Sequence, residues 1–249
     1  MPDNEMAGVT ALVTGASRGF GRGIAIALAG AGAQVVGVAR GRGALEELRA
    51  ELGESFTPVP ADAADPMVAG TLIDKYSPGV LVLNAGATPL PRPIQHHTWE
   101  TFSRNWDVDV AHVFHWTREA LLAPLAPGST VVTLSSGAAV FGSPLSGGYA
   151  GAKWAIRWLT AYAAGESQRA ELGIRFVSLL PQLTAATELG AVFTAAYAAR
   201  DGDGAAARGG PGSVLTPAQV GQAVTGLVTR PGPDQDAYLV TAAGLRPLP

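Results

Sequence analysis

The chain has 249 residues, of which 47% are hydrophobic and 15% are charged, and its formal net charge at pH 7 is −3. This length supports one large domain, which we expect to span residues 1–249. The weakly acidic balance argues against a nucleic-acid partner, and the absence of cysteine excludes disulfides and thiolate metal sites.

The chain starts with MPDNEMAG, which has acidic residues and lacks the apolar core of a signal peptide. No apolar run approaches the roughly 18 residues that a membrane-spanning helix needs. We therefore expect a cytoplasmic protein with no membrane segment.

Short apolar runs rich in β-branched residues alternate with segments of helical pattern along the chain. The predicted strands are residues 9–14, 34–39, 56–61, 80–83, 130–134, 174–180 and 238–241. The predicted helices are residues 22–29, 44–52, 66–76, 98–125, 149–172 and 217–229. This alternation predicts the α/β class, with a doubly wound, seven-stranded parallel sheet and helices on both of its faces.

A glycine-rich stretch, VTGASRGFG at residues 13–21, follows the first predicted strand and opens the first helix. Its glycines, Gly15, Gly19 and Gly21, depart from the common G-x-G-x-x-G order. A glycine turn in this place lets a pyrophosphate approach the free N–H groups at the start of the helix. The position therefore predicts a dinucleotide-binding turn.

The second predicted strand ends in basic residues where NAD-binding proteins carry an acid for the ribose 2′-hydroxyl. Arg40 fills that place, Arg42 follows, and Arg18 lies inside the glycine turn. Guanidinium groups suit a 2′-phosphate, which favours NADP(H) as cofactor. The alternative is that these arginines are solvated surface residues.

The stretch LSSGAAVFGSPLSGGYAGAK places Ser135 and Ser136 after a strand and Tyr149 and Lys153 four residues apart on one helix face. Tyrosine, with a reference pKa of about 10, needs a downward shift of about 3 units to act as acid and base near neutrality. A lysine ammonium about 4 Å away supplies about the 4 kcal/mol required at an effective dielectric constant of 20. We expect Ser136 to bind the substrate oxygen and Tyr149 to donate the proton during hydride transfer.

At these residues the chain resembles the classical short-chain dehydrogenase/reductase family over essentially its whole length. The shared motifs are the T-G-x-x-x-G-x-G turn from Thr14 to Gly21, an acid after the third strand (Asp62), an N-A-G segment (residues 84–86), and a serine thirteen residues before Y-x-x-x-K. The glycine order is thus the family's own spacing.

The resemblance implies a single-domain Rossmann fold and a homo-oligomer, either a dimer or a tetramer. It implies catalytic roles for Ser136, Tyr149, Lys153 and Asp109. Helical spacing, and not the resemblance, argues against a metal site. The implied cofactor contacts are Gly15, Ser17, Arg18, Gly19, Gly21, Arg40, Asp62, Ala63, Asn84, Ala85, Gly86, Tyr149, Lys153, Pro181 and Thr184.

The chain departs from the family pattern at four places. Leu83 replaces the first asparagine of N-N-A-G, and VTAAG replaces Asp-Gly-Gly near the C-terminus. Gln182 replaces the glycine after Pro181, which leaves either Thr184 or Thr187 to contact the carboxamide. Asp109 replaces the tetrad asparagine, which is thought to act through its main-chain carbonyl; the aspartate either keeps that role or shifts the pH optimum.

Residues 198–213, rich in glycine and alanine, are expected to form a mobile loop, either a substrate lid or an inert excursion. The candidate wall of an apolar substrate pocket is Phe141, Leu145, Phe193 and Tyr197; the alternative is that these residues belong to the hydrophobic core. His96 and His97 are expected to be solvated, and His112 and His115 lack the spacing of a helical zinc motif.

The helix around Trp154, Trp158 and Tyr162 is apolar over much of its circumference, so we expect a second subunit, or alternatively a loop, to cover its outer face.

These features predict an NADP(H)-dependent reductase that interconverts a ketone or aldehyde and an alcohol, with an apolar small molecule as substrate. Two alternatives remain at this level. One is reduction of a C=N or activated C=C bond, and the other is a non-catalytic, cofactor-binding regulatory protein.

Overall fold

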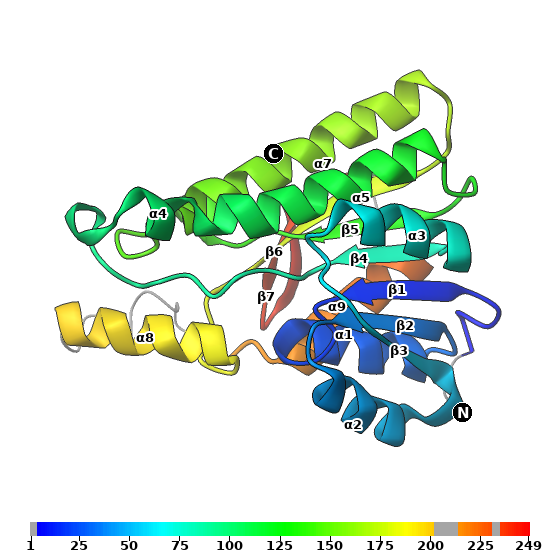
Figure 1. Cartoon of the computed structure of the whole chain (residues 1–249), viewed down its shortest axis with the longest axis horizontal. Coiled ribbons are helices and arrows are strands. Elements are labelled where there is room, and N and C mark those ends of the chain that lie inside the picture. The colour runs from blue at the N-terminus through cyan, green and yellow to red at the C-terminus, as the bar shows by residue number, and fades with distance from the viewer. Residues whose placement is uncertain (1–3, 202–213, 231–234) are drawn as a thin grey trace.

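A computed structural model describes residues 4–201, 214–230 and 235–249, and it shows a central sheet between two layers of helices (Figure 1). The strands are β1 (Thr10–Thr14), β2 (Gln34–Ala39), β3 (Phe56–Pro60), β4 (Val80–Leu83), β5 (Thr130–Leu134), β6 (Arg175–Pro181), β7 (Ala237–Thr241) and β8 (Gly244–Pro247). Their order in the sheet is β3-β2-β1-β4-β5-β6-β7-β8.

The predicted class and the parallel core of the sheet are confirmed, but the strand number was one too low. Strands β1 to β7 run parallel, and β8 adds an antiparallel edge strand beside β7. This edge strand has only four residues, GLRP, and its arginine and proline hide the apolar pattern that identifies a strand.

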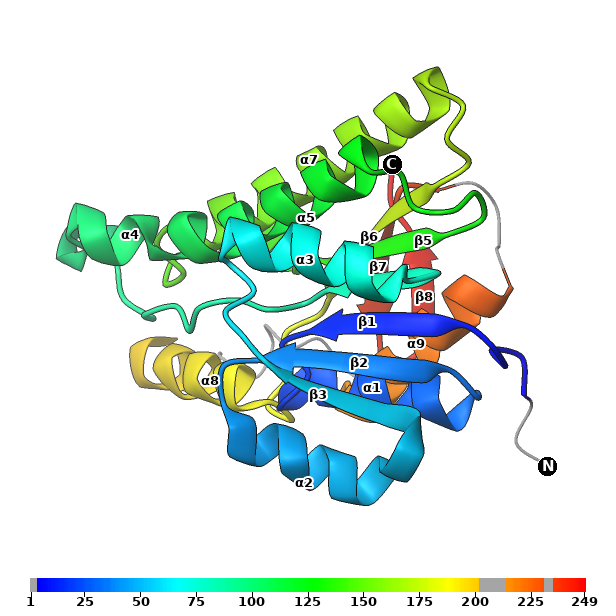
Figure 2. The same ribbon diagram turned by 45° about the vertical axis from the view of Figure 1, so that its right-hand side comes forward.

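The helices are α1 (Gly19–Gly30), α2 (Arg42–Leu52), α3 (Pro66–Tyr76), α4 (Trp99–Asn105), α5 (Ala111–Leu122), α6 (Ala138–Phe141), α7 (Tyr149–Arg169), α8 (Glu188–Asp201) and α9 (Pro217–Thr229). Helices α1, α2 and α9 cover one face of the sheet, and α3, α5 and α7 cover the other (Figure 2).

Alternate residues of each strand supply the two cores. In β1, Ala11 and Val13 belong to the core under α1 and α9, whereas Leu12 belongs to the core under α5 and α7. All four residues of β4 are buried, as expected for a strand covered on both faces. Each fully buried leucine or valine contributes about 1.5–3 kcal/mol, so the sheet is a rigid platform for the loops at its ends.

The chain reverses its winding direction between β1 and β4, which are neighbours although β2 and β3 intervene in the sequence. In a doubly wound sheet, ligands bind in the crevice at the carboxyl ends of the strands beside such a switch point. In Figure 2 the arrowheads of β1 and β2 point toward the side where α4 and α8 lie.

The helix predicted over residues 98–125 is interrupted. It consists of α4, a π-helical turn from Trp106 to Val110, and α5. Such turns are common at functional sites, and this one contains Asp109.

Part of the predicted loop at residues 198–213 is helical instead, since residues 198–201 form the end of α8. The remainder, residues 202–213, lies outside the described residues. Within the described part of the chain, no helix combines the length and apolar character needed to cross a bilayer.

Candidate active site

A cavity of about 1380 Å³ opens at the carboxyl ends of the parallel strands. Its walls come from the glycine turn, the ends of β2 to β6, the segment around Asp109, and α7 and α8. Every catalytic and cofactor-binding candidate named from the sequence lines this cavity except Gly21. The fold therefore brings together residues that are up to about 170 positions apart in the chain.

The glycine turn is packed so tightly that side chains do not fit. A Cβ at Gly15 would lie 2.7 Å from the Asn84 side-chain nitrogen, and one at Gly21 would lie 2.1 Å from the carbonyl oxygen of Gly15. Gly15 and Gly19 also have positive φ angles of 67° and 54°, which favour glycine. Gly21 thus supports the turn from beneath instead of lining the cavity.

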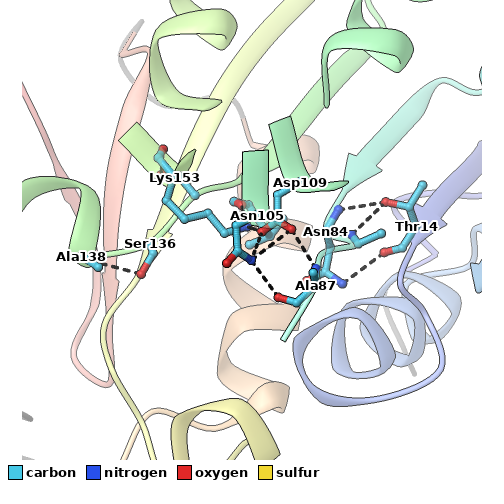
Figure 3. A network of polar contacts seen from close by, with 11 residues as sticks. Thr14, Asn84, Ala87, Asn105, Asp109, Ser136, Ala138 and Lys153 are labelled. Atoms are coloured by element: carbon cyan, nitrogen blue, oxygen red, sulfur yellow. Dashed lines mark hydrogen bonds and ion pairs between the residues drawn. The ribbon is translucent and has the colours of Figure 1, made fainter. Parts of the chain in front are cut away.

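Hydrogen bonds fasten this turn to the end of β4. The Thr14 hydroxyl donates to the Val82 carbonyl and accepts from the Asn84 backbone N–H, at 3.2 and 2.9 Å. The Asn84 side-chain amide donates to the carbonyl oxygens of Thr14 and Gly15, at 3.1 and 3.3 Å (Figure 3). The Asn84 side chain is therefore a clamp between the two loops, and the adjacent Ala85 and Gly86 line the floor.

Exposed charged residues lie at the end of the cavity that the glycine turn forms, which we call the turn end. Arg40 at the end of β2 is exposed, and the Arg18 guanidinium forms an ion pair with Glu188 at the start of α8. Glu188 was not expected, because no sequence motif links it to Arg18, 170 residues away.

Asp62 and Ala63 lie at the end of β3, where the Asp62 carboxylate accepts a 3.0 Å hydrogen bond from the Ala64 N–H. The indole N–H of Trp116, on α5, donates to the Ala63 carbonyl at 2.8 Å and fixes this loop.

The opposite end of the cavity holds the serine, tyrosine and lysine. The Ser136 hydroxyl oxygen accepts from the Ala138 N–H at 3.2 Å, and the neighbouring Ser135 donates to the Lys153 carbonyl at 2.6 Å. The Lys153 ammonium lies 5.6 Å from the centre of the Tyr149 ring and donates to the Leu134 carbonyl at 3.2 Å.

A direct ion pair joins Lys153 to Asp109, with 3.2 Å between the Lys153 Nζ and the Asp109 Oδ2. Burial lowers the pKa of Lys153, but the charges of Asp109 and Tyr149 and the hydrogen bond to Asp109 together outweigh it, so the pKa lies above its ordinary value. From the sequence we considered a role for the Asp109 main chain; in the structure its side chain contacts the lysine.

Asn105, which sequence reasoning missed, supports this pair. Its side-chain amide donates to the Ala87 carbonyl at 2.9 Å and lies 3.4 Å from both Asp109 carboxylate oxygens (Figure 3). The spacing of four residues before Asp109 was the signal available in the sequence.

His112, one turn after Asp109, is fully buried at the back of the cavity. Burial, with a smaller effect from the Lys153 charge, lowers its pKa to about 3, so the imidazole is neutral at physiological pH. Within the described residues, no group of three or more histidine, aspartate or glutamate side chains is arranged to hold a metal ion.

The expected apolar wall is largely present. Phe141, Phe193 and Tyr197 line the cavity, and Phe193 packs on the Tyr149 ring with 6.2 Å between ring centres. Leu145 instead packs in a small cluster with Phe193 and Tyr197.

The prediction that His97 is solvated was wrong, because its ring is partly buried and its Nδ1 contacts the Thr101 hydroxyl.

Gln182 and Thr184 lie where the chain leaves β6. Gln182 lines the cavity, and its backbone N–H donates to the Val240 carbonyl at 2.9 Å. The Thr184 hydroxyl donates to the Leu215 carbonyl at 2.6 Å, whereas the Thr187 hydroxyl accepts from the Gly190 N–H at 3.1 Å. Both threonines line the cavity.

Comparisons with known proteins show what this chain is similar to. A family model described as short chain dehydrogenase matches residues 9–198. The NADPH-dependent pterin aldehyde reductase of Arabidopsis thaliana is 32% identical over 166 residues, which cover 63% of this chain and 68% of that protein. Carbonyl reductase (NADPH) 2 of Sus scrofa is 32% identical over 181 residues, which cover 72% of this chain and 73% of that protein.

Among solved structures, the 3-ketoacyl-(acyl-carrier-protein) reductase from Brucella melitensis, complexed with NADH, is similar with a TM-score of 0.74 and 26% sequence identity. The match covers 89% of this chain and 91% of that chain.

Proposed function

Because the chain belongs to the short-chain dehydrogenase family, we propose that it is an NADP(H)-dependent reductase that converts a small aldehyde or ketone into an alcohol. The observation that carries the proposal is the position of Ser136, Tyr149 and Lys153 in the same cavity as the glycine turn. The pterin aldehyde and carbonyl reductases named above favour an enzyme over a non-catalytic cofactor-binding protein.

The residues at the turn end fit a dinucleotide phosphate. Gly19 leaves space for a pyrophosphate at the start of α1, since a Cβ there would meet only the Thr187 methyl group at 3.9 Å, and α1 begins without a side-chain cap on its first N–H groups. Arg40 and Arg18 offer positive charge for the 2′-phosphate that distinguishes NADP(H) from NAD(H). The proposed contacts are Gly15, Ser17, Arg18, Gly19, Arg40, Asp62, Ala63, Asn84, Ala85, Gly86, Pro181 and Thr184, with Gly21 as support.

At the other end, the chain's own residues manage the proton. NADPH supplies a hydride when it is bound. Ser136 donates a hydrogen bond to the substrate oxygen, and the Tyr149 hydroxyl transfers its proton to that oxygen. The Lys153 ammonium stabilises the resulting phenolate and binds the ribose, while Asp109 holds the lysine in place.

The aromatic wall favours an apolar carbonyl compound. Phe193 lies beside the Tyr149 ring, Tyr197 and Phe141 add ring surface elsewhere on the cavity wall, and Ser136 provides the polar end.

The proposal is tested by following NADPH oxidation with apolar ketones, aldehydes, diketones and cyclic imines. Tyr149→Phe should lower kcat/KM by about 10²- to 10⁴-fold, because general acid catalysis is lost, while NADPH binds almost as tightly as before. Turnover of imines and not of ketones would mean that the enzyme reduces C=N bonds instead of the C=O bonds proposed here. Undiminished turnover by the variant would remove the tyrosine mechanism.

A second copy of the chain is the proposed partner, in a dimer or tetramer. Trp154, Trp158 and Tyr162 form a ladder of ring contacts along α7, yet their side chains remain 44–64% exposed. Phe114 on the neighbouring α5 is 48% exposed. Exposed aromatic surface of this extent is typical of an interface.

Light scattering should therefore give a mass that is a multiple of the monomer, and Trp158→Glu should reduce it toward the monomer. A monomeric parent would refute the proposed assembly. A cytoplasmic location remains a prediction from the sequence.

A further inference from the structure

The Asp109 carboxylate has a different donor on each of its oxygens. Oδ1 accepts from the Ala87 N–H at 2.7 Å, and Oδ2 contacts the Lys153 ammonium at 3.2 Å. The Asn105 amide lies 3.4 Å from each oxygen. The Asp109 and Lys153 side chains are 1% and 8% exposed, so water screens this pair very little.

The surrounding chain is shaped for a carboxylate. Gly86 leaves the space, since a Cβ there would lie 2.8 Å from Asp109 Oδ2. An asparagine at position 109 has one oxygen for two donors, so its NH₂ group would face either the Ala87 N–H or the Lys153 ammonium. A carboxylate satisfies both donors at once.

The charged and titratable groups facing the pair come from several elements. On α7 these are Lys153 and Tyr149, and on the π turn and α5 they are Asp109 and the neutral His112. The charged groups elsewhere on the cavity wall are Arg18, Arg40, Asp62, Arg104, Glu188 and Arg246. Of the residues in the described part of the chain, Asp109 makes the direct ion pair with Lys153.

We propose that Asp109 is a positioning residue that acts through Lys153: its carboxylate offsets the charge of the ammonium and thereby limits how strongly Lys153 stabilises a phenolate at Tyr149. A lysine without a counter-charge would stabilise the phenolate strongly and favour loss of the tyrosine proton. With Asp109 paired to it, the same lysine stabilises the phenolate less and therefore favours loss of the tyrosine proton less strongly. Reduction needs a tyrosine that donates its proton, so the ion pair favours that direction of the reaction. This consequence rests on the proposed function, whereas the effect of Asp109 on Tyr149 can be measured without turnover.

The test is a pH titration of tyrosinate absorbance in the enzyme without cofactor, with the signal of Tyr149 obtained by subtracting the matching Tyr149→Phe protein. In Asp109→Asn, Tyr149 should ionise about one pH unit lower than in the parent, because a like charge near the phenolate has been removed. Asp107→Asn is the matched control. That carboxylate lies two residues earlier, is exposed and accepts from the Ser103 hydroxyl, so the titration should not move.

Tyr149 ionising at the same or a higher pH in Asp109→Asn would overturn the inference. If this variant does not unfold cooperatively, Asp109→Ser removes the charge with a smaller side chain, and the same shift is expected. The titration requires no turnover. A protein that shows the shift but oxidises no NADPH with any carbonyl compound would therefore contradict the proposed function and leave the Asp109 inference intact.

Discussion

Two ion pairs lie at opposite ends of one cavity, and their surroundings differ sharply. At the end that holds Ser136, Tyr149 and Lys153, the proposed catalytic end, Lys153 and Asp109 are 8% and 1% exposed. At the turn end, Arg18 and Glu188 are 65% and 73% exposed. Both pairs join a cation to a carboxylate, yet burial gives them different physical consequences.

A buried ion pair can be broken only at a large cost in the free energy of unfolding. Removing one partner leaves the other charge buried with neither a counter-charge nor water, which is strongly destabilising. An exposed ion pair contributes only about 0–1 kcal/mol to stability. The phosphate contact that we propose for Arg18 would therefore cost little, since only an exposed ion pair with Glu188 has to be given up. The buried ion pair at the proposed catalytic end is therefore held in place without a ligand, whereas the exposed ion pair at the turn end can rearrange.

Lys153→Met should show the largest stability loss, about 3–5 kcal/mol of unfolding free energy at neutral pH, because Asp109 remains buried without its partner. Urea denaturation measures this loss. The chain's other lysine provides the control: Lys75 is exposed on α3, and Lys75→Met should change stability by no more than about 0.5 kcal/mol. Equal losses of unfolding free energy in both variants would show that burial does not distinguish the two lysines.

His112 extends the comparison to acid pH. Its pKa is about 3 in the folded chain and 6.5 ordinarily, so the unfolded state binds the proton first and stability falls as pH drops below 6.5. Between pH 6.5 and pH 5 this single group should lower the free energy of unfolding by about 1.6 kcal/mol.

His112→Leu removes that contribution, so its unfolding free energy should decline less steeply than that of the parent below pH 6.5 and run parallel to it above pH 7. Denaturation curves at several pH values measure both slopes. Identical acid slopes in parent and variant would mean that His112 accepts a proton inside the fold.

The turn end was largely predictable from sequence. Gly15, Arg40 and Asp62 each lie one or two residues after a strand of a parallel sheet, and the carboxyl ends of such strands meet at one edge. Local pattern and topology therefore sufficed to bring them together. The tyrosine and lysine were predictable for a similar reason, because four residues on a helix fix their relative direction.

The contacts at the catalytic end were not predictable in the same way. Whether Asp109 uses its carbonyl or its carboxylate depends on the π turn, on the space left by Gly86 and on the Asn105 amide. Each of these is a tertiary fact with no periodic signal. The Glu188 pairing also escaped notice, because α8 has weak amphipathic character and meets the glycine turn only in the folded chain.

The smallest expected effect lies at the turn end. Arg40→Asp should weaken NADPH binding by about tenfold and leave NADH binding nearly unchanged, because a single exposed charge facing a 2′-phosphate contributes about 1.5 kcal/mol. Fluorescence titration of both cofactors gives the ratio. Arg42→Asp is the matched control: Arg42 lies two residues later, pairs with Glu46 at 3.8 Å, and does not line the cavity. If Arg40→Asp weakens both cofactors equally, the arginine acts on the shared part of the dinucleotide, and selectivity must come from Arg18 after it leaves Glu188.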